Sequence, residues 1–237
     1  GTHNEFYQIR NVFVRQNFGS YRFSSLQDFL TGANAAQYDR SYSLVDNVTG
    51  DNTAAAADFA AMQLGLYAQD EAYVTRNLKL TAGIRLDIPI FTDKPQTDTY
   101  FNETTIPLIE AAYQGVLDDP LQGARAGQMP KTQLMLSPRI GFNWDVTGKQ
   151  KTQIRGGAGI FTSRVPFVWP GGSFTNNGLS VGGVRQFNVP FIANPFNQPT
   201  TVDFGGTDKI PSGEMNLFAK NFKYPQVFRT SLALDQE

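Results

Sequence analysis

The sequence predicts an all-β fold: an antiparallel up-and-down meander from a large transmembrane β-barrel, with long extracellular loops that carry short helices. Three observations predict this fold. From Leu78 onward, apolar and polar residues alternate strictly over about eleven positions. A tilted strand that spans a bilayer needs about 9–11 residues, whereas globular strands most often have about 5–6. Finally, the connections between such segments are alternately short and long.

The composition excludes several classes of protein. The 237 residues carry a formal net charge of −1, which implies neither a nucleic-acid-binding surface nor a strongly charged partner. The absence of cysteine excludes a disulfide framework, a thiolate metal site and a cysteine nucleophile. The single histidine, His3, argues against a zinc site and a Ser-His-Asp triad, so we expect no metal and no cofactor. No apolar run approaches the roughly 18–20 residues of a membrane helix, and the mean hydropathy of −0.31 fits a porin-like chain as well as a soluble one.

Residues 1–58 predict an extracellular loop region with a hairpin and a short helix. Extended patterns on either side of the turn signal Asn17-Phe18-Gly19-Ser20 predict the hairpin. Ser24 is the candidate N-cap of the helix, and Gly32 is a natural helix stop. The polar residues 33–58 predict a surface loop that leads to the first long strand.

Two long hairpins with matching alternation predict the barrel wall. The first covers residues 59–89 and turns at Thr75-Arg76-Asn77. The second covers residues 132–163 and turns at Thr147-Gly148-Lys149-Gln150. Both hairpins are long enough to cross a bilayer and return.

The remaining segments are two long loops and one further strand. Residues 90–131 predict an extracellular loop in which Thr105 caps a short helix near Pro107. Residues 164–224 predict a long extracellular loop, and residues 225–237 begin the next barrel strand. Loops longer than about 12–15 residues are uncommon in compact domains. Outer-membrane barrels, however, combine short periplasmic turns with long extracellular loops. Alternation alone leaves open a soluble antiparallel sheet whose apolar face packs on a second sheet.

One face of the predicted strands repeatedly carries charged and amide side chains, as a wet barrel lumen would. We expect these side chains to form cross-strand pairs rather than to bind a ligand directly. The apolar face would then meet lipid. The predicted lumen-facing polar residues are Arg85, Asp87, Arg139, Asn143, Asp145, Arg155, Arg229 and Asp235.

Ligand recognition is best placed in the loop 164–224, whose aromatic rings and side-chain amides offer stacking and hydrogen bonds. An alternative is that this loop packs on its own aromatic residues. The acidic pairs Asp46/Asp51 and Asp118/Asp119 lack the spacing of a calcium loop, so a solvated surface is the preferred interpretation there. The candidate ligand-binding residues are Phe167, Trp169, Phe174, Asn176 and Asn177.

Segments of the predicted wall resemble TonB-dependent outer-membrane receptors. Tyr67-Ala68-Gln69-Asp70 is similar to that family's Y-x-Q-D strand, and Leu80–Asp87 to the L-x-x-G-x-R-x-D strand that follows it. Leu136–Phe142, with its Ser-Pro-Arg, is similar to the next strand, and Ile154–Phe161 to the one after that. The order and spacing of these segments make the resemblance specific.

Two further segments, Tyr21–Gly32 and Lys223–Gln226, resemble the Oar-like subgroup typical of Bacteroidota. The resemblance implies a barrel of about 22 strands in the bacterial outer membrane. Such a receptor binds a ligand with its extracellular loops and imports it through a plugged lumen with energy from the TonB complex. The implied partners are the TonB complex, acting through a plug region not in this chain, the unknown transported ligand, surface lipoproteins and outer-membrane lipid. No nucleic acid and no catalysed reaction are implied.

The predicted strands cannot close a barrel by themselves. About five strands leave open edges, and unpaired backbone groups are costly in lipid, so we expect a mid-barrel piece of a longer protein. One alternative function is a soluble secreted β-sandwich that binds carbohydrate or protein. Another is a secreted hydrolase with paired carboxylates, but Asp70 and Glu71 point to opposite faces of a strand and cannot flank one bond.

Overall fold

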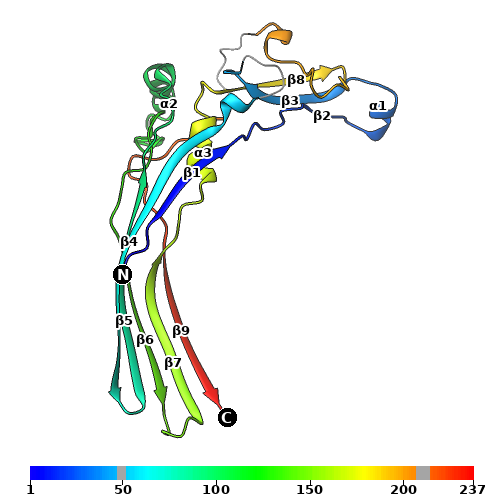
Figure 1. Cartoon of the computed structure of the whole chain (residues 1–237). Coiled ribbons are helices and arrows are strands. Elements are labelled where there is room, and N and C mark those ends of the chain that lie inside the picture. Colours follow the sequence, from blue (N-terminus) through cyan, green and yellow to red (C-terminus); the bar gives the residue numbers. More distant parts are fainter. Residues whose placement is uncertain (47–51, 207–213) are drawn as a thin grey trace.

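The computed structural model describes residues 1–46, 52–206 and 214–237, and its strands form two antiparallel sheets. The larger sheet, which we call the wall, has six strands in the order β1-β4-β5-β6-β7-β9. The small sheet has three strands in the order β2-β3-β8. Figure 1 shows a tall, curved wall whose upper end carries the small sheet. The strands are β1 (Glu5–Asn11), β2 (Ser20–Arg22), β3 (Ala35–Ser43), β4 (Ala57–Thr75), β5 (Leu78–Phe91), β6 (Met135–Asp145), β7 (Thr152–Thr162), β8 (Val181–Val189) and β9 (Gln226–Gln236).

The described residues also contain short helical segments, which lie in the upper half of Figure 1. No helix in the described part of the chain has the length and apolar character needed to span a membrane. The helical segments are α1 (Leu26–Leu30), α2 (Ile106–Ala112), α3 (Val168–Thr175), the 3-10 turns Thr53–Ala55 and Val202–Phe204, and the π turn Phe101–Thr105.

The two hairpins predicted from alternation form the centre of the wall. β4 pairs with β5 and leaves only Arg76-Asn77 as the turn, and β6 pairs with β7 across a turn at residues 146–151. β9 pairs with β7 along its whole length, beginning at the pair Thr162 and Gln226. The short turns lie at one end of the wall, called the turn end, and the long connections leave from the other, the loop end (Figure 1). The structure confirms the predicted antiparallel meander.

The apolar face of the wall is exposed. Leu66, Leu86 and Leu136 lie opposite one another on three neighbouring strands, and Leu66 and Leu136 are each more than half exposed. Ile140 and Leu232 are 60% and 76% exposed on the same face. In the described part of the chain, therefore, no second sheet packs on this face, which removes the main requirement of the β-sandwich interpretation.

The first strand does not form the predicted hairpin. β1 pairs with β4 from Asn11 opposite Ala57 to Glu5 opposite Gln63, so it belongs to the wall. β2 pairs with β3 instead. The prediction was wrong because the turn signal at residues 17–20 marked a break between two strands without showing which partner each would pair with.

Two predicted loops contain two of the three strands of the small sheet. Residues 33–58, predicted as a loop, contain β3, and residues 164–224 contain α3 and β8. β3 pairs with β8 from Ala35 opposite Val189 to Ser43 opposite Val181. The two partners are so far apart in the sequence that neither segment, taken alone, resembles half of a hairpin.

The first predicted helix forms, but with a different cap. Ser25, rather than Ser24, is the N-cap of α1, and its Oγ accepts a hydrogen bond of 3.1 Å from the backbone N–H of Asp28. Gly32 lies just past the helix in the left-handed region, with φ of 71°, as expected for a helix stop.

The second predicted helix is shorter and begins earlier. Thr105 makes no capping hydrogen bond, because it lies inside a helical stretch that begins at Thr99 and continues through the π turn from Phe101. The carboxylate of Asp98 supplies the cap, accepting a hydrogen bond of 2.9 Å from the backbone N–H of Phe101. α2 ends at Ala112 rather than continuing toward Asp118.

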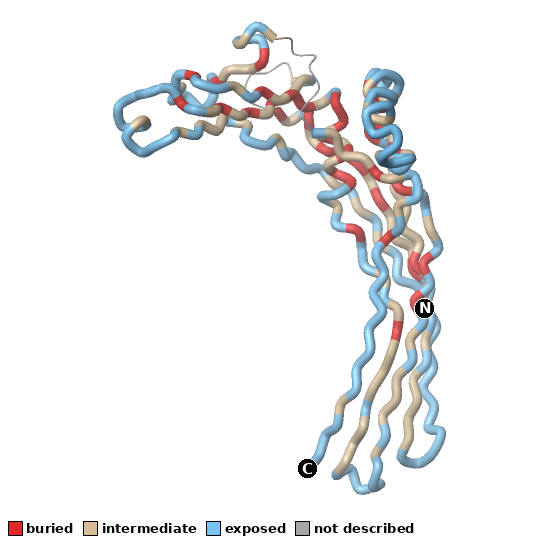
Figure 2. Tube along the Cα trace, turned by 180° about the vertical axis from the view of Figure 1, so that it is seen from behind, coloured by how far each residue is buried: buried red, intermediate tan, exposed pale blue. Residues whose placement is uncertain are grey.

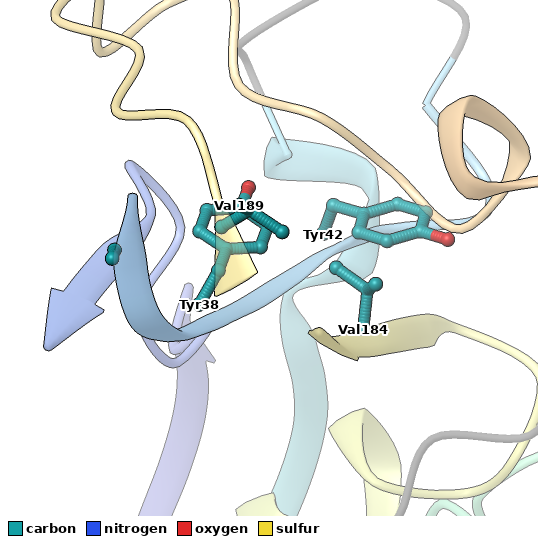
Figure 3. Close-up of a cluster of buried hydrophobic side chains, with 5 residues drawn as sticks. Tyr38, Tyr42, Val184 and Val189 are labelled. Carbon is teal, nitrogen blue, oxygen red and sulfur yellow. The ribbon is translucent and has the colours of Figure 1, made fainter. Parts of the chain in front are cut away.

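The small sheet has its own hydrophobic core. Tyr38 and Tyr42 of β3 lie beside Val184 and Val189 of β8, as Figure 3 shows, and all four are buried. The Tyr38 hydroxyl donates to a backbone carbonyl at 2.8 Å, and the Tyr42 hydroxyl donates to a threonine hydroxyl at 2.7 Å, both within residues 190–204. That segment therefore covers the aromatic face of β3.

Candidate functional site

The inner face of the wall changes character between its two ends. We define this face by the odd-numbered positions of β4 to β9, which include the predicted lumen residues. On β4 it begins with Ala57, Phe59 and Ala61 at the loop end, all buried, and continues with Gln69 and Glu71 near the turn end, both exposed. The same face is thus apolar and covered at one end, and polar and open at the other.

The loop-end half is covered by the segment that follows β7. The ring of Phe59 stacks on Phe174 with centroids 4.8 Å apart, and Phe167 lies edge-on to Tyr7 at 4.7 Å. Gly171 of α3 faces Ala57 and Phe59 closely enough that an added Cβ would lie 3.7–3.8 Å from their side chains. α3 therefore packs directly on β4 and β1.

A charged contact fixes the start of this covering segment. Arg164 Nη2 lies 3.1 Å from Glu5 Oε1, and its guanidinium carbon lies 5.0 Å from the centroid of the Tyr7 ring. β7 and β1 are separated in the wall by β6, β5 and β4. Residues 164–175, which we call the strap, therefore return across the inner face from β7 to β1.

A second hydrophobic cluster covers the neighbouring part of the inner face, toward β6. Met135, Val165 and Tyr224 are each 5% exposed and pack together with Phe91 and Phe222. By the usual area rule, burying each large apolar side chain contributes about 1.5–3 kcal/mol. The strap and the residues before β9 are thus held on the wall by apolar packing.

Two of the candidate ligand-binding residues lie in this packing. Phe167 and Phe174 both contact Phe59, at ring-centroid distances of 6.3 and 4.8 Å. Trp169, on the same helix, is 50% exposed. The structure therefore brings Phe167 and Phe174 together on the wall and leaves Trp169 at the surface.

The two candidate asparagines have different surroundings. Asn177 is buried, and its side chain accepts from the backbone N–H groups of Leu179 and Ser180 at 2.8 Å. It also donates to the Phe174 carbonyl at 2.9 Å, so its amide holds a turn. Asn176 lines the hollow described below. Only Asn176 is positioned to meet a ligand with its amide.

Four of the eight predicted lumen residues form two ion pairs. Asp87 is 2% exposed, lies 2.8 Å from Arg85 Nη2, and accepts a hydrogen bond of 3.2 Å from Gln63 Nε2. Arg155 Nε and Asp235 Oδ2 are 2.9 Å apart across β7 and β9. These contacts are the expected local and cross-strand pairing of charges on one face.

Asp145 and Asn143 lie at the turn end. Asp145 accepts hydrogen bonds of 2.9 Å from the backbone N–H groups of Gly148 and Gln150, so its carboxylate fixes the turn after β6. Asn143 lies opposite Lys79 on one side and Arg155 on the other.

Arg139 and Arg229 complete the predicted set. They lie on either side of Gly159 in one cross-strand row. Within the described ranges, neither arginine forms an ion pair.

A hollow of about 400 Å³ lies at the loop end, against the face of the small sheet opposite its aromatic core. Its charged lining comes from segments that lie far apart in the sequence. Because the relevant stretches of β3 and β8 were predicted as loops, the sequence reasoning missed these residues; the alternation of Gln37, Asp39 and Ser41 with larger side chains was the available signal. The lining residues are Phe13, Arg15, Gln16, Asp39, Arg40, Ser41, Asn176, Val181, Gly183, Val184, Arg185 and Glu214.

An ion pair across the small sheet shapes one side of the hollow. Arg185 Nε and Asp39 Oδ1 are 2.5 Å apart on opposing strands, and Gln37 also donates to Asp39. Partial burial alone would raise the pKa of Asp39, but the hydrogen bonds from Arg185 and Gln37 outweigh it and lower that pKa. The buried Arg40 donates to the carbonyls of Asn17 and Gln198, joining the segments on either side of β3.

The acidic pairs do not gather into a metal site in the described residues. No group of three or more His, Cys, Asp or Glu side chains suited to a metal ion occurs there. Asp46 accepts a hydrogen bond of 2.9 Å from the backbone N–H of Ala54, and Asp119 accepts one of 3.0 Å from that of Gly123. Asp51 lies outside the described residues.

Comparison with known proteins gives one match. A family model described as "Outer membrane beta barrel domain" matches residues 1–237. No curated protein and no solved structure matches the chain.

Proposed function

Because this chain belongs to the outer membrane β-barrel domain family and lies in the outer membrane, we propose that it supplies wall strands and surface loops to a TonB-dependent receptor. The receptor is Oar-like, binds a ligand at the cell surface and imports it through a plugged barrel. It catalyses no reaction. Its partners are the TonB complex, acting through a plug region, the transported ligand, outer-membrane lipid and surface lipoproteins.

The pairing of the motif strands supports this proposal. The segment Tyr67-Ala68-Gln69-Asp70 lies on β4 directly beside Ala82–Arg85 of β5. The neighbouring Asp87 of that motif accepts from Arg85 and Gln63, so the polar motif residues hold two adjacent strands together. We therefore assign the Arg and Asp of the motif a structural role, which is to hold neighbouring strands of the barrel wall together.

The open edges of the wall support a larger closed barrel. In the turn-end half, the edge of β4 beyond Tyr67 has no partner strand among the described residues. β1 covers β4 only between Ala57 and Gln63, and the N-terminal residues reach only as far as a bridge from Thr2 to Leu66 and the hydrogen bonds of Gly1 with Tyr67. β9 pairs on one side only. Each unpaired backbone group costs several kcal/mol in lipid, so further strands must complete the sheet. We propose that a longer protein supplies them.

The hollow at the loop end is the single observation that carries the ligand-binding part of the proposal. It has a volume of about 400 Å³ and combines guanidinium, carboxylate and amide groups from the small sheet and from the segments beside it. Small-molecule sites occupy about 300–1,000 Å³ and hold a few convergent polar groups. Arg15, Asn176 and Arg185 are the residues that we expect to contact the ligand.

The test uses the full-length parent protein in its own host. Material extracted from outer membranes with and without energised TonB complex is analysed by native mass spectrometry for bound small molecules, and uptake of any identified molecule is then measured. We expect uptake to require the TonB complex and binding to fall at least tenfold in an Arg15→Glu/Arg185→Glu variant. Arg125→Glu, which alters a pair with Glu110 in another loop, is the matched control. Uptake that persists without the TonB complex would overturn the proposal.

A further inference from the structure

The small sheet ends at a strand that has no partner on its outer side. β8 pairs with β3, and no further strand of the described residues pairs with its other edge (Figure 1). An edge strand presents unpaired backbone N–H and C=O groups, and proteins commonly protect such an edge with proline or lysine. β8 contains neither of these residues, and its one charged side chain, that of Arg185, is paired with Asp39 of β3. The outer edge of β8 is therefore open to pairing with another chain.

The hydrogen bonds of β3 show which backbone groups of β8 point outward. In an antiparallel pair, the N–H and C=O of one residue point to the same side, and successive residues alternate. The Ser41 N–H donates to the Arg15 carbonyl, on the side of β3 away from β8, so the opposing Gly183 also directs its backbone groups away from the pair. A threonine hydroxyl that donates to the Gly183 carbonyl at 3.4 Å agrees with this direction. Arg185 and Phe187 have the same parity, so their N–H and C=O groups point to the outer edge as well.

The outward groups are accessible along a short stretch of β8. In the described part of the chain, no hydrogen bond involves the N–H groups of Gly183, Arg185 or Phe187. Phe187 and the side chain of Arg185 are 64% and 66% exposed, whereas Val181 and Val189 at the ends of the strand are buried. The accessible edge thus covers residues 183–187, about the length of an ordinary strand.

This edge borders the hollow at the loop end. Gly183 and Arg185 line the hollow, as do Ser41 of β3 and Arg15. A Cβ added at Gly183 would have only the Arg40 carbonyl oxygen and Ser41 Oγ within 4 Å, at 3.8 and 3.9 Å, so the surface over this glycine is free. Side chains of directly opposing residues lie on the same face of a sheet. A residue paired with Gly183 would therefore direct its side chain over the glycine and into the hollow.

The charges of the hollow favour an acidic side chain at that place. Its described lining contains three arginines and two carboxylates, which leaves one excess positive charge. Arg185 is already paired, and the buried Arg40 donates to backbone carbonyls. Arg15 forms no ion pair with any described residue. A carboxylate that crosses Gly183 would meet the Ser41 hydroxyl and then the guanidinium of Arg15, which matches its geometry.

We propose that the small sheet binds a short, extended peptide that adds a strand to the outer edge of β8 and places one Asp or Glu side chain over Gly183. Strand addition draws affinity from main-chain hydrogen bonds and specificity from alternate side chains. The outward groups of residues 183–187 supply the affinity, and Arg15 with Ser41 supplies the specificity. The proposal rests on the proposed function, because it names the class of ligand that the hollow captures.

The first experiment selects peptides with the full-length parent protein in lipid nanodiscs. The protein is incubated with a random library of acetylated, amidated heptapeptides, and the retained peptides are sequenced by mass spectrometry. We expect them to carry one Asp or Glu at a constant position between residues of high β-propensity. Arg15→Glu should lower their retention at least tenfold, and Arg125→Glu, in another loop, is the matched control. No retention above that of empty nanodiscs would overturn the proposal.

Methylation of the peptide backbone tests strand addition without changing the protein. Each N–H of a retained peptide is methylated in turn, and its affinity is measured by isothermal titration calorimetry. We expect a loss of at least tenfold at alternate positions and of less than threefold at the positions between them, because only alternate N–H groups face β8. Equal losses at all positions, or a loss confined to the acidic residue, would contradict strand addition. This measurement also decides the matter if a variant does not assemble.

The outward N–H of Phe187 provides the complementary test on the protein. Phe187→Pro removes this N–H together with the ring, whereas Phe187→Ala removes the ring alone. Proline is tolerated in edge strands where its missing N–H would face outward. We expect Phe187→Pro to bind the peptide at least tenfold more weakly than Phe187→Ala, and equal binding would overturn the proposal. Boiling-dependent gel mobility shows that each barrel has assembled.

The outcomes separate the peptide ligand from the receptor proposal. If uptake requires the TonB complex but the hollow retains no peptide, or only a ligand that is not a peptide, the proposal made here fails and the proposed function stands. If peptides bind with the alternating methylation pattern but uptake persists without the TonB complex, the proposed function fails and the strand addition stands. A β8 edge that another segment of the parent protein already occupies would also retain no peptide, which overturns the proposal.

Discussion

The two halves of the inner face are built from the same strands, but one half is apolar and covered and the other is polar and exposed. At the loop end, Phe59 and Ala61 are 1% and 3% exposed because the strap covers them. Ten residues further along the same face of β4, Gln69 and Glu71 are exposed. Figure 2 shows this contrast, with buried residues gathered in the upper part of the molecule and few on the lower strands. The identity of a strand face therefore depends on what covers it at each level.

The comparison also shows that apolar side chains of the wall occur in two environments. Leu66 points outward and is exposed, as a lipid-facing residue should be, whereas Phe59 points inward and is buried under α3. The outer face is apolar around Leu66, although it carries Arg10 and Asp58 at the loop end. The inner face switches from apolar to polar near Gln63, which lies opposite Glu5. Arg164, at the start of the strap, contacts Glu5 there, and the charged pairs begin at the same level.

The strap's main contact is tested most strongly by Phe59→Ala. The change removes a ring that stacks on Phe174, so we expect the full-length barrel to lose about 3–5 kcal/mol of unfolding free energy, as large core truncations do. Urea titration of the protein in lipid vesicles measures the loss. Gln69→Ala, on the same face in the open half, should change the free energy by less than about 0.5 kcal/mol. Equal losses at the two sites would show that the halves are not differently covered.

The buried charge pair should respond next most strongly. Asp87→Asn weakens the hydrogen bonds from Arg85 and Gln63 to a nearly inaccessible carboxylate, so we expect a loss of about 1.5–3 kcal/mol. The same urea titration applies. Asp235→Asn in the exposed pair with Arg155 serves as control, with an expected loss of about 0–1 kcal/mol. A loss at Asp235 as large as that at Asp87 would contradict the assigned difference in burial.

The clamp between Arg164 and Glu5 should contribute less. Both side chains are partly exposed, so we expect a coupling energy of about 0.2–1 kcal/mol from a double-mutant cycle with Arg164→Gln and Glu5→Gln. The local effect should be clearer than the global one. Limited proteolysis should cut the strap faster in either single variant, and unchanged cleavage would show that the aromatic contacts alone hold it.

The smallest expected effect concerns pH at the small sheet. The pKa of Asp39 is lowered in the folded protein, so its contribution to stability is fully present above the ordinary carboxyl pKa of about 3.9. It is lost as the pH falls through the lowered folded value. We expect the difference in urea midpoint between wild type and Asp39→Asn to stay constant from pH 8 to 5 and to shrink below about pH 4. A difference that shrinks between pH 7 and 5 would contradict a lowered pKa.

The sequence predicts the long strands well because alternation over a full membrane crossing is a local signal. β5 begins at Leu78 as predicted, and β9 begins at Gln226. The strap was not predicted. An apolar residue such as Phe59 in an alternating strand is compatible with contact to lipid and with packing under another segment, and the sequence pattern does not distinguish the two. Phe167 and Phe174 were assigned to ligand binding from their chemistry alone, and that assignment stays a prediction while the structure places them on the wall.

The small sheet was missed for a different reason. β3 and β8 depend on each other, and a sequence pattern read segment by segment does not report partners separated by four wall strands. The hollow that lies against this sheet was missed with the two strands. Residues such as Arg185 and Asp39 acquire their roles only when both strands are in place.

The pairing of β3 with β8 also sets an order of assembly. Asp39 and Arg185 are separated by 146 residues, and β4 to β7 lie between them in the chain. Closing so long a loop is slow unless the intervening strands have already formed, because contacts that are distant in sequence carry a large entropic cost. We therefore expect the two wall hairpins, whose contacts are local in sequence, to form before β8 pairs with β3. The small sheet would then depend on the wall for its formation, whereas the two wall hairpins would not depend on the small sheet.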